Sequence, residues 1–348
     1  MSNTTNAFHA LALQTRCRGV NALDVDAARA AMLATIARID RQIGAAKRFI
    51  GSDTRLVVLP EYFLSGFPMG ESIAEWCAKA ALADGGPEYR ALAGIAERHD
   101  VYLAGNAYET DPHFPGLYFQ ACFVFAPSGA RLLTYRRLVS MFAPTPHDVL
   151  DRYIDVYGVD ALFPVVDSDI GRLAAVASEE ILYPEITRAL ALRGAEVIVH
   201  STSEIGSPDP TPKDIAKRAR AFENSVYVVS ANSAGIDDIG IPAESTDGMS
   251  KIVDYQGRVL ASAGFGESIV ASAELDIAAL RRWRRRPGMS NVLSRQRTEL
   301  IALAVEDLPV YPANTLLDAD GNPTVPERGH FTDTQRKTIA QLAKRGLI

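Results

Sequence analysis

Hydrophobic residues along the chain follow two alternating patterns. Short runs rich in Val, Ile and Leu predict buried β-strands, and longer stretches with apolar residues every three or four positions predict amphipathic helices. Strands are predicted at 8–14, 55–59, 101–107, 120–125, 131–138, 171–177, 196–200, 226–231, 251–254, 258–260 and 269–275, and helices at 24–46, 86–99, 184–193, 214–224 and 333–345. This alternation indicates an α/β fold in which helices cover sheets.

The same pattern indicates one large domain, residues 8–280, followed by a C-terminal extension, residues 281–348. No stretch within the domain has the composition of a linker. We expect the extension to pack on the domain or on a partner subunit. Residues 139–160, rich in Pro, Asp and aromatics, predict a long loop with about one helical turn, and loops of this length are often functional.

Composition narrows the classes of function. The chain of 348 residues has 47% hydrophobic residues, enough for a large core, and its net charge of −6 offers no basic field for nucleic acid. We interpret the one basic cluster, 281–286, as a helix end or a subunit contact rather than a phosphate site. No apolar run or N-terminal pattern indicates a membrane span or a signal peptide, so we expect a cytoplasmic protein without nucleic-acid or membrane partners.

The cysteines and histidines show no framework. Cys17, Cys77 and Cys122 are too few and too scattered for a disulfide scaffold. The six histidines lack metal-ligand spacing, so we expect no metal site.

The stretch GRLAAVASEEILYPE, residues 171–185, predicts a strand, a sharp turn and a helix. Ser178 ends the strand, Glu179 and Glu180 follow, and Pro184 suits the first turn of a helix. A hydroxyl at such a turn stands beside backbone N–H groups, where many α/β enzymes place a nucleophile. The alternative is an ordinary polar turn residue.

Charged residues end two other predicted strands. Glu61 follows an apolar run in LVVLPEYFLSGFP, and Arg137 lies in LLTYRRLV. Burial of an acid is costly unless the acid is paired or takes part in chemistry, so Glu61 is a candidate functional residue. The alternative is that the Glu61 carboxylate reaches solvent beyond the strand end.

The order and surroundings of these three residues resemble the nitrilase, or carbon–nitrogen hydrolase, superfamily. Further similar segments are GAEVIV, RARAFENSVYVVSANSAG and GMSKIVDYQGRVLASAG, so the resemblance covers about residues 8–275. It implies a four-layer αββα sandwich, a homodimer or larger homo-oligomer, and a small-molecule substrate. The implied chemistry needs no metal or cofactor: a thiolate attacks an amide or nitrile carbon, a Glu acts as base, and a Lys with a backbone N–H holds the oxyanion.

The chain departs from the family pattern at two positions, with Ser178 in place of the Cys and Arg137 in place of the Lys. A serine hydroxyl is far less acidic than a thiol, whose pKa is about 8.5, so it needs a stronger base or more oxyanion assistance. Arg137 keeps the charge but cannot donate a proton at neutral pH. No other residue is expected to replace the two, because the cysteines lie in other segments and Lys213 and Lys217 lie beyond the central strand.

Four further residues are candidates for substrate binding: Tyr62, Asp151, Glu179 and Ser203. Asp151 is chosen from three acids in a loop where the family carries a second Glu. We expect Glu180 to be a structural partner of an arginine such as Arg188 or Arg218.

Three hypotheses remain open. The first is a hydrolase that acts on a small amide or nitrile through an acyl-enzyme on Ser178, with Glu61 as base and Arg137 as charge stabiliser. The second is a catalytically degenerate relative, a pseudoenzyme with a binding or scaffolding role. The third is that Ser178 is an introduced replacement for a native cysteine, which leaves Arg137 unexplained.

Overall fold

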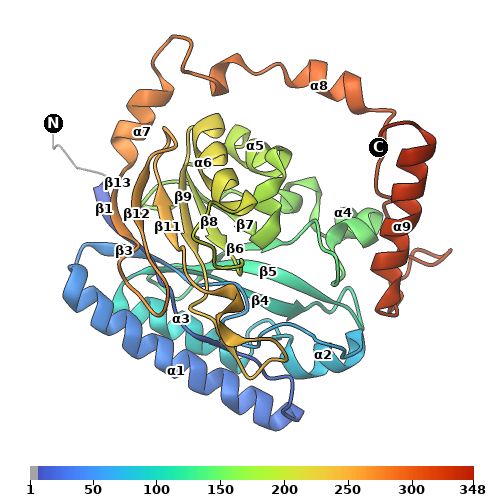
Figure 1. Ribbon diagram of the computed structural model, residues 1–348, viewed down its shortest axis with the longest axis horizontal. Coiled ribbons are helices and arrows are strands. Elements are labelled where there is room, and N and C mark those ends of the chain that lie inside the picture. The colour runs from blue at the N-terminus through green and yellow to red at the C-terminus, as the bar shows by residue number, and fades with distance from the viewer. Residues whose placement is uncertain (1–6) are drawn as a thin grey trace.

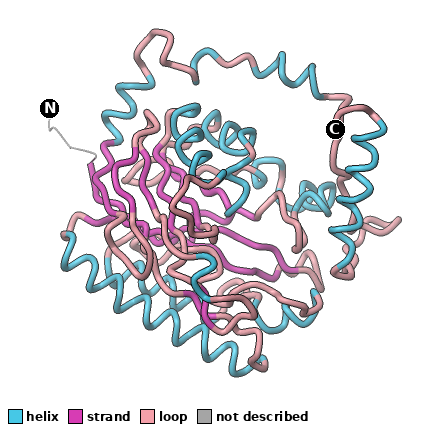
Figure 2. The backbone as a smooth tube through the Cα atoms, viewed as in Figure 1, coloured by secondary structure: helices cyan, strands magenta, loops and turns pink. Residues whose placement is uncertain are grey.

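Two β-sheets form the centre of the protein, and the computed structural model describes residues 7–348 (Figures 1 and 2). The first sheet has the order β13-β1-β3-β4-β5-β6 and the second the order β12-β11-β9-β8-β7. The first contains β1 (Ala7–Ala12), β3 (Thr54–Val58), β4 (Tyr102–Thr110), β5 (Tyr118–Phe125), β6 (Arg131–Arg136) and β13 (Ser272–Asp276). The second contains β7 (Leu173–Ala177), β8 (Val197–Ser201), β9 (Tyr227–Ala231), β11 (Lys251–Val253) and β12 (Val259–Ser262), and β2 (Cys17–Arg18) pairs with β10 (Ile236–Asp237).

Helices cover the outer face of each sheet. Met32 and Ile36 of α1 (Val25–Ile50) and Leu92 of α3 (Pro87–His99) are buried in one cluster with Val57 and Leu103 of the first sheet. On the other side, α5 (Pro184–Leu192) and α6 (Pro212–Asn224) pack on the second sheet (Figure 1). The order of layers is therefore helix, sheet, sheet, helix, which confirms the four-layer αββα sandwich.

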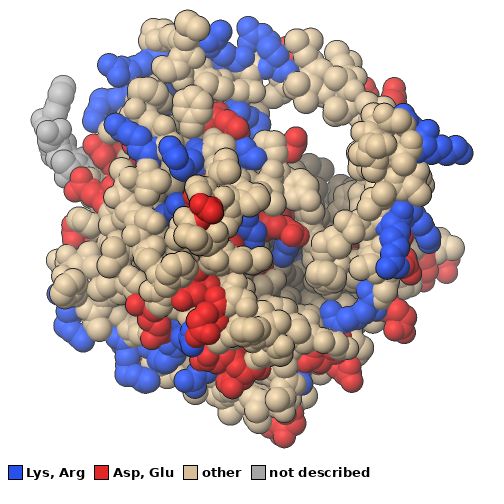
Figure 3. Space-filling model, viewed as in Figure 1, with Lys and Arg blue, Asp and Glu red and all other residues tan. Residues whose placement is uncertain are grey.

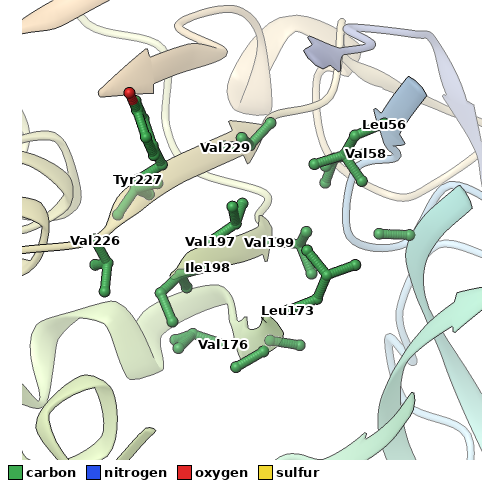
Figure 4. Packing of buried hydrophobic residues seen from close by; sticks show 14 of the residues in the cluster. Leu56, Val58, Leu173, Val176, Val197, Ile198, Val199, Val226, Tyr227 and Val229 are labelled. Atoms are coloured by element: carbon green, nitrogen blue, oxygen red, sulfur yellow. The ribbon is translucent and has the colours of Figure 1, made fainter. Parts of the chain in front are cut away.

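A continuous apolar core joins the inner faces of the two sheets. Figure 4 shows Leu56 and Val58 of β3 facing Leu173 and Val199 of the second sheet. A strand that is buried on both faces has an unbroken run of apolar residues. The sequence pattern therefore predicted these strands well.

The strands are oriented so that their carboxyl ends meet. β3 runs parallel to β1 and β4, and β7, β8 and β9 run parallel to one another. At the ends of β3 and β8 the Ser201 hydroxyl donates to the Leu59 carbonyl at 2.8 Å, and the Glu61 N–H donates to the Thr202 carbonyl at 3.3 Å. The residues that follow these strands are thereby held at one edge of the sandwich.

The C-terminal segment wraps around the body. It holds α7 (Ile277–Arg284), α8 (Thr298–Val305) and α9 (Gly329–Lys344), and Figure 3 shows an opening between this arm and the rest of the molecule. Arg281 pairs with Glu196, and Arg284 donates to the Ala195 and Ser225 carbonyls, so these two arginines hold a helix end on the domain. The expected boundary at residue 280 falls inside α7.

The sequence pattern missed several helices. Residues 139–160 hold the helix α4 (Leu150–Tyr157) rather than one turn, and α2 (Ile73–Ala80), α7 and α8 were not predicted. The signal for α2 was available, because Ser72 and Glu75 form a capping box at its start. Short 3₁₀ helices lie at Pro146–Val149, Val159–Leu162, Ser178–Leu182, Ala243–Thr246 and Leu293–Arg295. In residues 7–348 no helix is long and apolar enough to cross a membrane.

Candidate active site

Ser178 stands at the sharp turn that the sequence predicts. It directly follows β7, and its φ of +47° lies in the left-handed region, a conformation that costs about 1–3 kcal/mol for a residue other than glycine. The His200 ring holds this turn: Nε2 donates to the Ser178 carbonyl at 2.8 Å, and Nδ1 accepts from the Ser230 hydroxyl at 2.8 Å. Burial and the nearby Lys217 charge lower the pKa of His200 well below 6.5, so the ring is neutral.

Glu61 is the third residue after β3 and is fully buried. Its Oε1 accepts from Gln120 Nε2 at 2.6 Å and from Arg137 Nη1 at 3.4 Å. Its Oε2 is buried and accepts no hydrogen bond from any residue between 7 and 348. Beside it, burial and the Glu61 charge raise the pKa of the Tyr62 phenol, which therefore stays protonated. The carboxylate thus keeps one oxygen available.

Arg137 follows β6 and is buried among acceptors. Its Nε donates to the Val139 carbonyl at 2.6 Å, Nη1 donates to Gln120 Oε1 at 2.7 Å, and Nη2 pairs with Glu179. Burial alone would lower the pKa of Arg137. The negative charges of Glu61 and Glu179 raise this pKa by more than burial lowers it, so the guanidinium stays charged. Most of its donors are already bound to the protein.

These side chains surround one cavity of about 220 Å³. The structure brings together six of the seven predicted site residues there: Glu61, Tyr62, Arg137, Ser178, Glu179 and Ser203. The remaining walls come from Phe67, Pro68, Tyr108, Gln120, Ser140, Met141, Phe142, Ala143 and Lys213. In the described part of the chain, no group of three or more His, Cys, Asp or Glu residues could hold a metal ion.

Asp151 is the predicted site residue that the structure places elsewhere. It is exposed in the first turn of α4 and does not line this cavity among the described residues. Tyr153, two positions later, is the buried residue of that helix. Positions two apart lie on roughly opposite sides of an α-helix, so burial of Tyr153 turns Asp151 toward solvent.

Glu180 is structural, but its partners differ from those expected. Oε1 accepts from the Leu138 and Val139 N–H groups at 2.7 and 3.1 Å. Oε2 accepts from Tyr135 Oη at 2.8 Å and from the Ala177 N–H at 3.2 Å. The expected pairing with Arg188 or Arg218 is therefore wrong, since these arginines donate to the Glu223 and Gly257 carbonyls. Glu180 ties the segment after β6 to the end of β7.

Sequence reasoning missed two polar site residues, Gln120, which bonds to both Glu61 and Arg137, and Lys213. Its Nζ lies 3.0 Å from Ser178 Oγ, although the sequence led us to expect no contribution from this lysine. The helix α6 begins at Pro212, with Thr211 as its N-cap, whereas the predicted helix began at 214. The Thr-Pro pair was the available signal, because it marks a helix start that puts residue 213 in the first turn.

The cavity therefore joins a hydroxyl at a strained turn, a buried carboxylate with one free oxygen, and two cations. The carbon–nitrogen hydrolase family model matches residues 16–285, most of the chain. The chain belongs to the carbon–nitrogen hydrolase family. The structural neighbours confirm the nitrilase fold that the sequence motifs indicated.

Several known proteins are similar in sequence to this chain. A protein of Pseudomonas protegens described as a hydrolase in the pqqF 5′ region is 32% identical over 63% of this chain and 71% of its own length. The human omega-amidase NIT2 is 26% identical over 72% of this chain and 86% of its own length.

Solved structures of the family share the fold. Nit3 of Saccharomyces cerevisiae is 20% identical, with a TM-score of 0.62 over 80% of this chain and 93% of its own. A mutant amidase from Nesterenkonia sp. AN1 is 20% identical, with a TM-score of 0.61 over 87% of this chain and 98% of its own. In that amidase the acetamide moiety of fluoroacetamide adds covalently to the active-site cysteine.

Proposed function

We propose that this protein hydrolyses a small amide or nitrile through an acyl-enzyme on Ser178, with Glu61 as the base. One observation carries the proposal: Ser178 and Glu61 line the same cavity, and Glu61 Oε2 is buried there without a partner among residues 7–348. A buried acceptor without a donor is costly in a folded protein, so a bound substrate or the Ser178 hydroxyl is its natural partner. Similarity to omega-amidases and to an amidase of known structure supports an amide as the first substrate class.

The reaction of an amide follows from these positions. Ser178 Oγ attacks the carbonyl carbon, an Oγ–C bond forms, and the hydroxyl proton moves to Glu61 Oε2. The C–N bond then breaks, and Glu61 returns the proton to the leaving nitrogen, which departs as ammonia. A water molecule attacks the ester, the carboxylic acid is released, and Ser178 regains its proton.

In this proposal Arg137 is mainly a positioning residue. Its guanidinium N–H groups donate to Gln120 and Glu179, and its positive charge lies beside Glu61. That charge attracts the carboxylate and helps to fix its position in the cavity. Glu179, Tyr62 and Ser203 then shape the substrate-binding part of the cavity.

A second candidate is a ligand-binding pseudoenzyme. It is favoured by one contact: within the described residues Ser178 Oγ bonds to Lys213 and makes no hydrogen bond with Glu61. Against it stand the open cavity and the single contact between Arg137 and Glu61, because a bidentate pair would have blocked the base. A measurement of substrate turnover distinguishes the hydrolase from the pseudoenzyme.

The test measures ammonia and carboxylate released from a panel of small amides, nitriles and esters. We expect the native chain to turn over at least one amide, and Ser178→Ala and Glu61→Gln to lose this activity. Ser128→Ala, at an exposed turn serine, is the matched control and should keep it. No release from any compound by the folded native chain would support the binding role instead.

We also propose that the protein is a cytoplasmic homodimer or larger homo-oligomer, with the C-terminal arm at an interface between copies. All three cysteines are free, as is usual in a reducing compartment. None of the residues of α8 is buried, and Leu300, Ile301 and Leu303 are 58%, 65% and 72% exposed. Exposed apolar groups clustered in this way are typical of a contact surface.

A further inference from the structure

Lys213 is bound by three oxygen acceptors at the edge of the cavity. Its Nζ lies 3.0 Å from Ser178 Oγ, 3.4 Å from Thr202 Oγ1 and 3.3 Å from the Ser203 carbonyl oxygen. An ammonium group has three N–H donors, and a carbonyl oxygen can only accept. The ammonium group can donate to all three oxygens at once, and one of them is the Ser178 oxygen that would attack the substrate.

The charge on Lys213 is not neutralised by the protein. Lys217, one helical turn later, pairs with the buried Glu204, and Arg137 pairs with Glu179 and contacts Glu61. By contrast, no carboxylate in residues 7–348 forms a salt bridge with Lys213, whose partners are two hydroxyls and a carbonyl. Of the two cations at the cavity, Lys213 is the one whose charge stays available for the reaction.

Lys213 lies at a helix position that disfavours a positive charge. It lies in the first turn of α6, after the N-cap Thr211, whose hydroxyl accepts from the Asp214 N–H. The N-terminus of a helix carries a partial positive charge, so a lysine there costs roughly 0.3–1 kcal/mol rather than stabilising the helix. The contacts of the ammonium group with Ser178, Thr202 and Ser203 offset this cost.

The contact between Lys213 and Ser178 Oγ bears on the low acidity of the serine hydroxyl. An attacking hydroxyl develops negative charge on oxygen and gains far more than a thiol from a cation at hydrogen-bond distance. Because Lys213 donates to Oγ, the hydroxyl hydrogen of Ser178 remains free to move to another acceptor, and Glu61 Oε2 is unpartnered in the described part of the chain. Arg137 cannot serve in this way, since its donors are bound to Val139, Gln120 and Glu179.

We propose that Lys213 is a catalytic residue that stabilises the negative charge on Ser178 Oγ and so compensates for the absence of a thiol. The inference rests on the proposed function of Ser178 as a nucleophile. In the attack step the proton of Ser178 goes to Glu61, and the Lys213 ammonium donates to Oγ as negative charge develops there. Ser178 and Lys213 thus form a functional pair contributed by the end of β7 and the start of α6.

The experiment follows acetylation of Ser178 by p-nitrophenyl acetate, with the modified peptide identified by mass spectrometry. In this step an Oγ–C bond forms, the bond from carbon to the aryl oxygen breaks, p-nitrophenolate leaves, and the hydroxyl proton moves to Glu61. The step requires no amide cleavage. Acetylation that depends on Lys213, with no amide turnover, would therefore retain the inference and refute the proposed amide chemistry.

We expect Lys213→Met to slow acetylation of residue 178 by roughly 100-fold or more, the usual effect of removing one charge-stabilising donor. In a Ser178→Cys background the same change should cost less than about tenfold, because a thiol ionises near pKa 8.5 without help. Lys337→Met, at an exposed lysine of α9, is the control and should leave both rates unchanged.

Lys213→Gln provides a second charge-removing variant, and circular dichroism melting shows which variants are folded. Three results would overturn the inference. They are equal acetylation in a folded Lys213→Met or Lys213→Gln chain, an equal loss in the serine and cysteine backgrounds, and no acetylation of Ser178 in the folded native chain.

Discussion

Arg137 contacts Glu61 through one nitrogen at 3.4 Å and does not form a two-pronged ion pair with it. Gln120 lies between them: its Oε1 accepts from Arg137 at 2.7 Å, and its Nε2 donates to Glu61 Oε1 at 2.6 Å. A bidentate pair would occupy both carboxylate oxygens, whereas this arrangement leaves Oε2 free. In the proposed reaction, the availability of Glu61 as a base therefore depends on Gln120.

Replacement of this glutamine tests that dependence. Gln120→Leu keeps a similar volume but removes the acceptor of Arg137 and a donor to Glu61, two buried charged groups. We expect the free energy of unfolding to fall by about 2–3 kcal/mol and acetylation of Ser178 to slow as Arg137 closes on Glu61. Urea unfolding and the acetylation assay measure the two effects. Gln256→Leu, in the turn between β11 and β12, is the control, and unchanged acetylation in Gln120→Leu would contradict the expectation.

The Glu180 carboxylate should be important for stability rather than for chemistry. Each of its oxygens accepts two hydrogen bonds. In Glu180→Gln, the amide NH₂ would replace one of these oxygens and face two hydrogen-bond donors. We expect the free energy of unfolding to fall by at least about 2 kcal/mol, as measured in urea. Glu185→Gln, at an exposed position of α5, should change it by less than about 0.5 kcal/mol. Similar values for the two variants would refute this role.

His200 should make stability depend on pH. Burial and Lys217 hold its pKa in the folded protein well below 6.5, the ordinary histidine value. When the pH falls below 6.5, the unfolded chain takes up a proton that the folded chain does not, so the free energy of unfolding decreases. His200→Gln can still donate to the Ser178 carbonyl but cannot titrate. We expect the free energy of unfolding to decrease less for His200→Gln than for the native protein as the pH falls. Urea unfolding at several pH values measures both. A difference that does not change with pH would exclude His200 as the cause.

The exposed apolar surface of α8 should govern association. Introduction of aspartate at both Leu300 and Leu303 would place charges in the proposed contact between copies. We expect the molar mass in solution, measured by size-exclusion chromatography with light scattering, to fall toward that of a single chain. Phe49→Asp, at another exposed apolar residue on α1, is the control and should leave the mass unchanged. If both proteins keep the native mass, the interface lies elsewhere.

The strands that carry the site could be predicted because their signals are local. Residues 55–59 and 171–177 are apolar runs ended by a charged or polar residue, and they correspond to β3 and β7. The same runs identified Glu61 and Ser178 as strand-end residues. Because strands buried between two layers must be apolar throughout, a polar residue at such an end is conspicuous in the sequence.

Long-range contacts were harder to predict. Three of the four partners of Glu180 are the backbone N–H groups of residues 138, 139 and 177, which carry no side-chain signal. The orientation of Asp151 depends on which face of α4 packs inward, and that face is defined by Tyr153. Both depend on how separate segments pack, and neither is encoded in the spacing of nearby residues.

The sequence by itself determined the layered α/β fold and the order of Glu61, Arg137 and Ser178 along the chain, because apolar periodicity and strand ends are local properties. Only the tertiary structure decided that Lys213, 35 residues after Ser178, contacts the Ser178 hydroxyl. The physical reason is that packing of α6 on the second sheet brings its first turn to the carboxyl end of β7. Tertiary packing likewise placed Gln120 between two charges and left one oxygen of Glu61 free for chemistry.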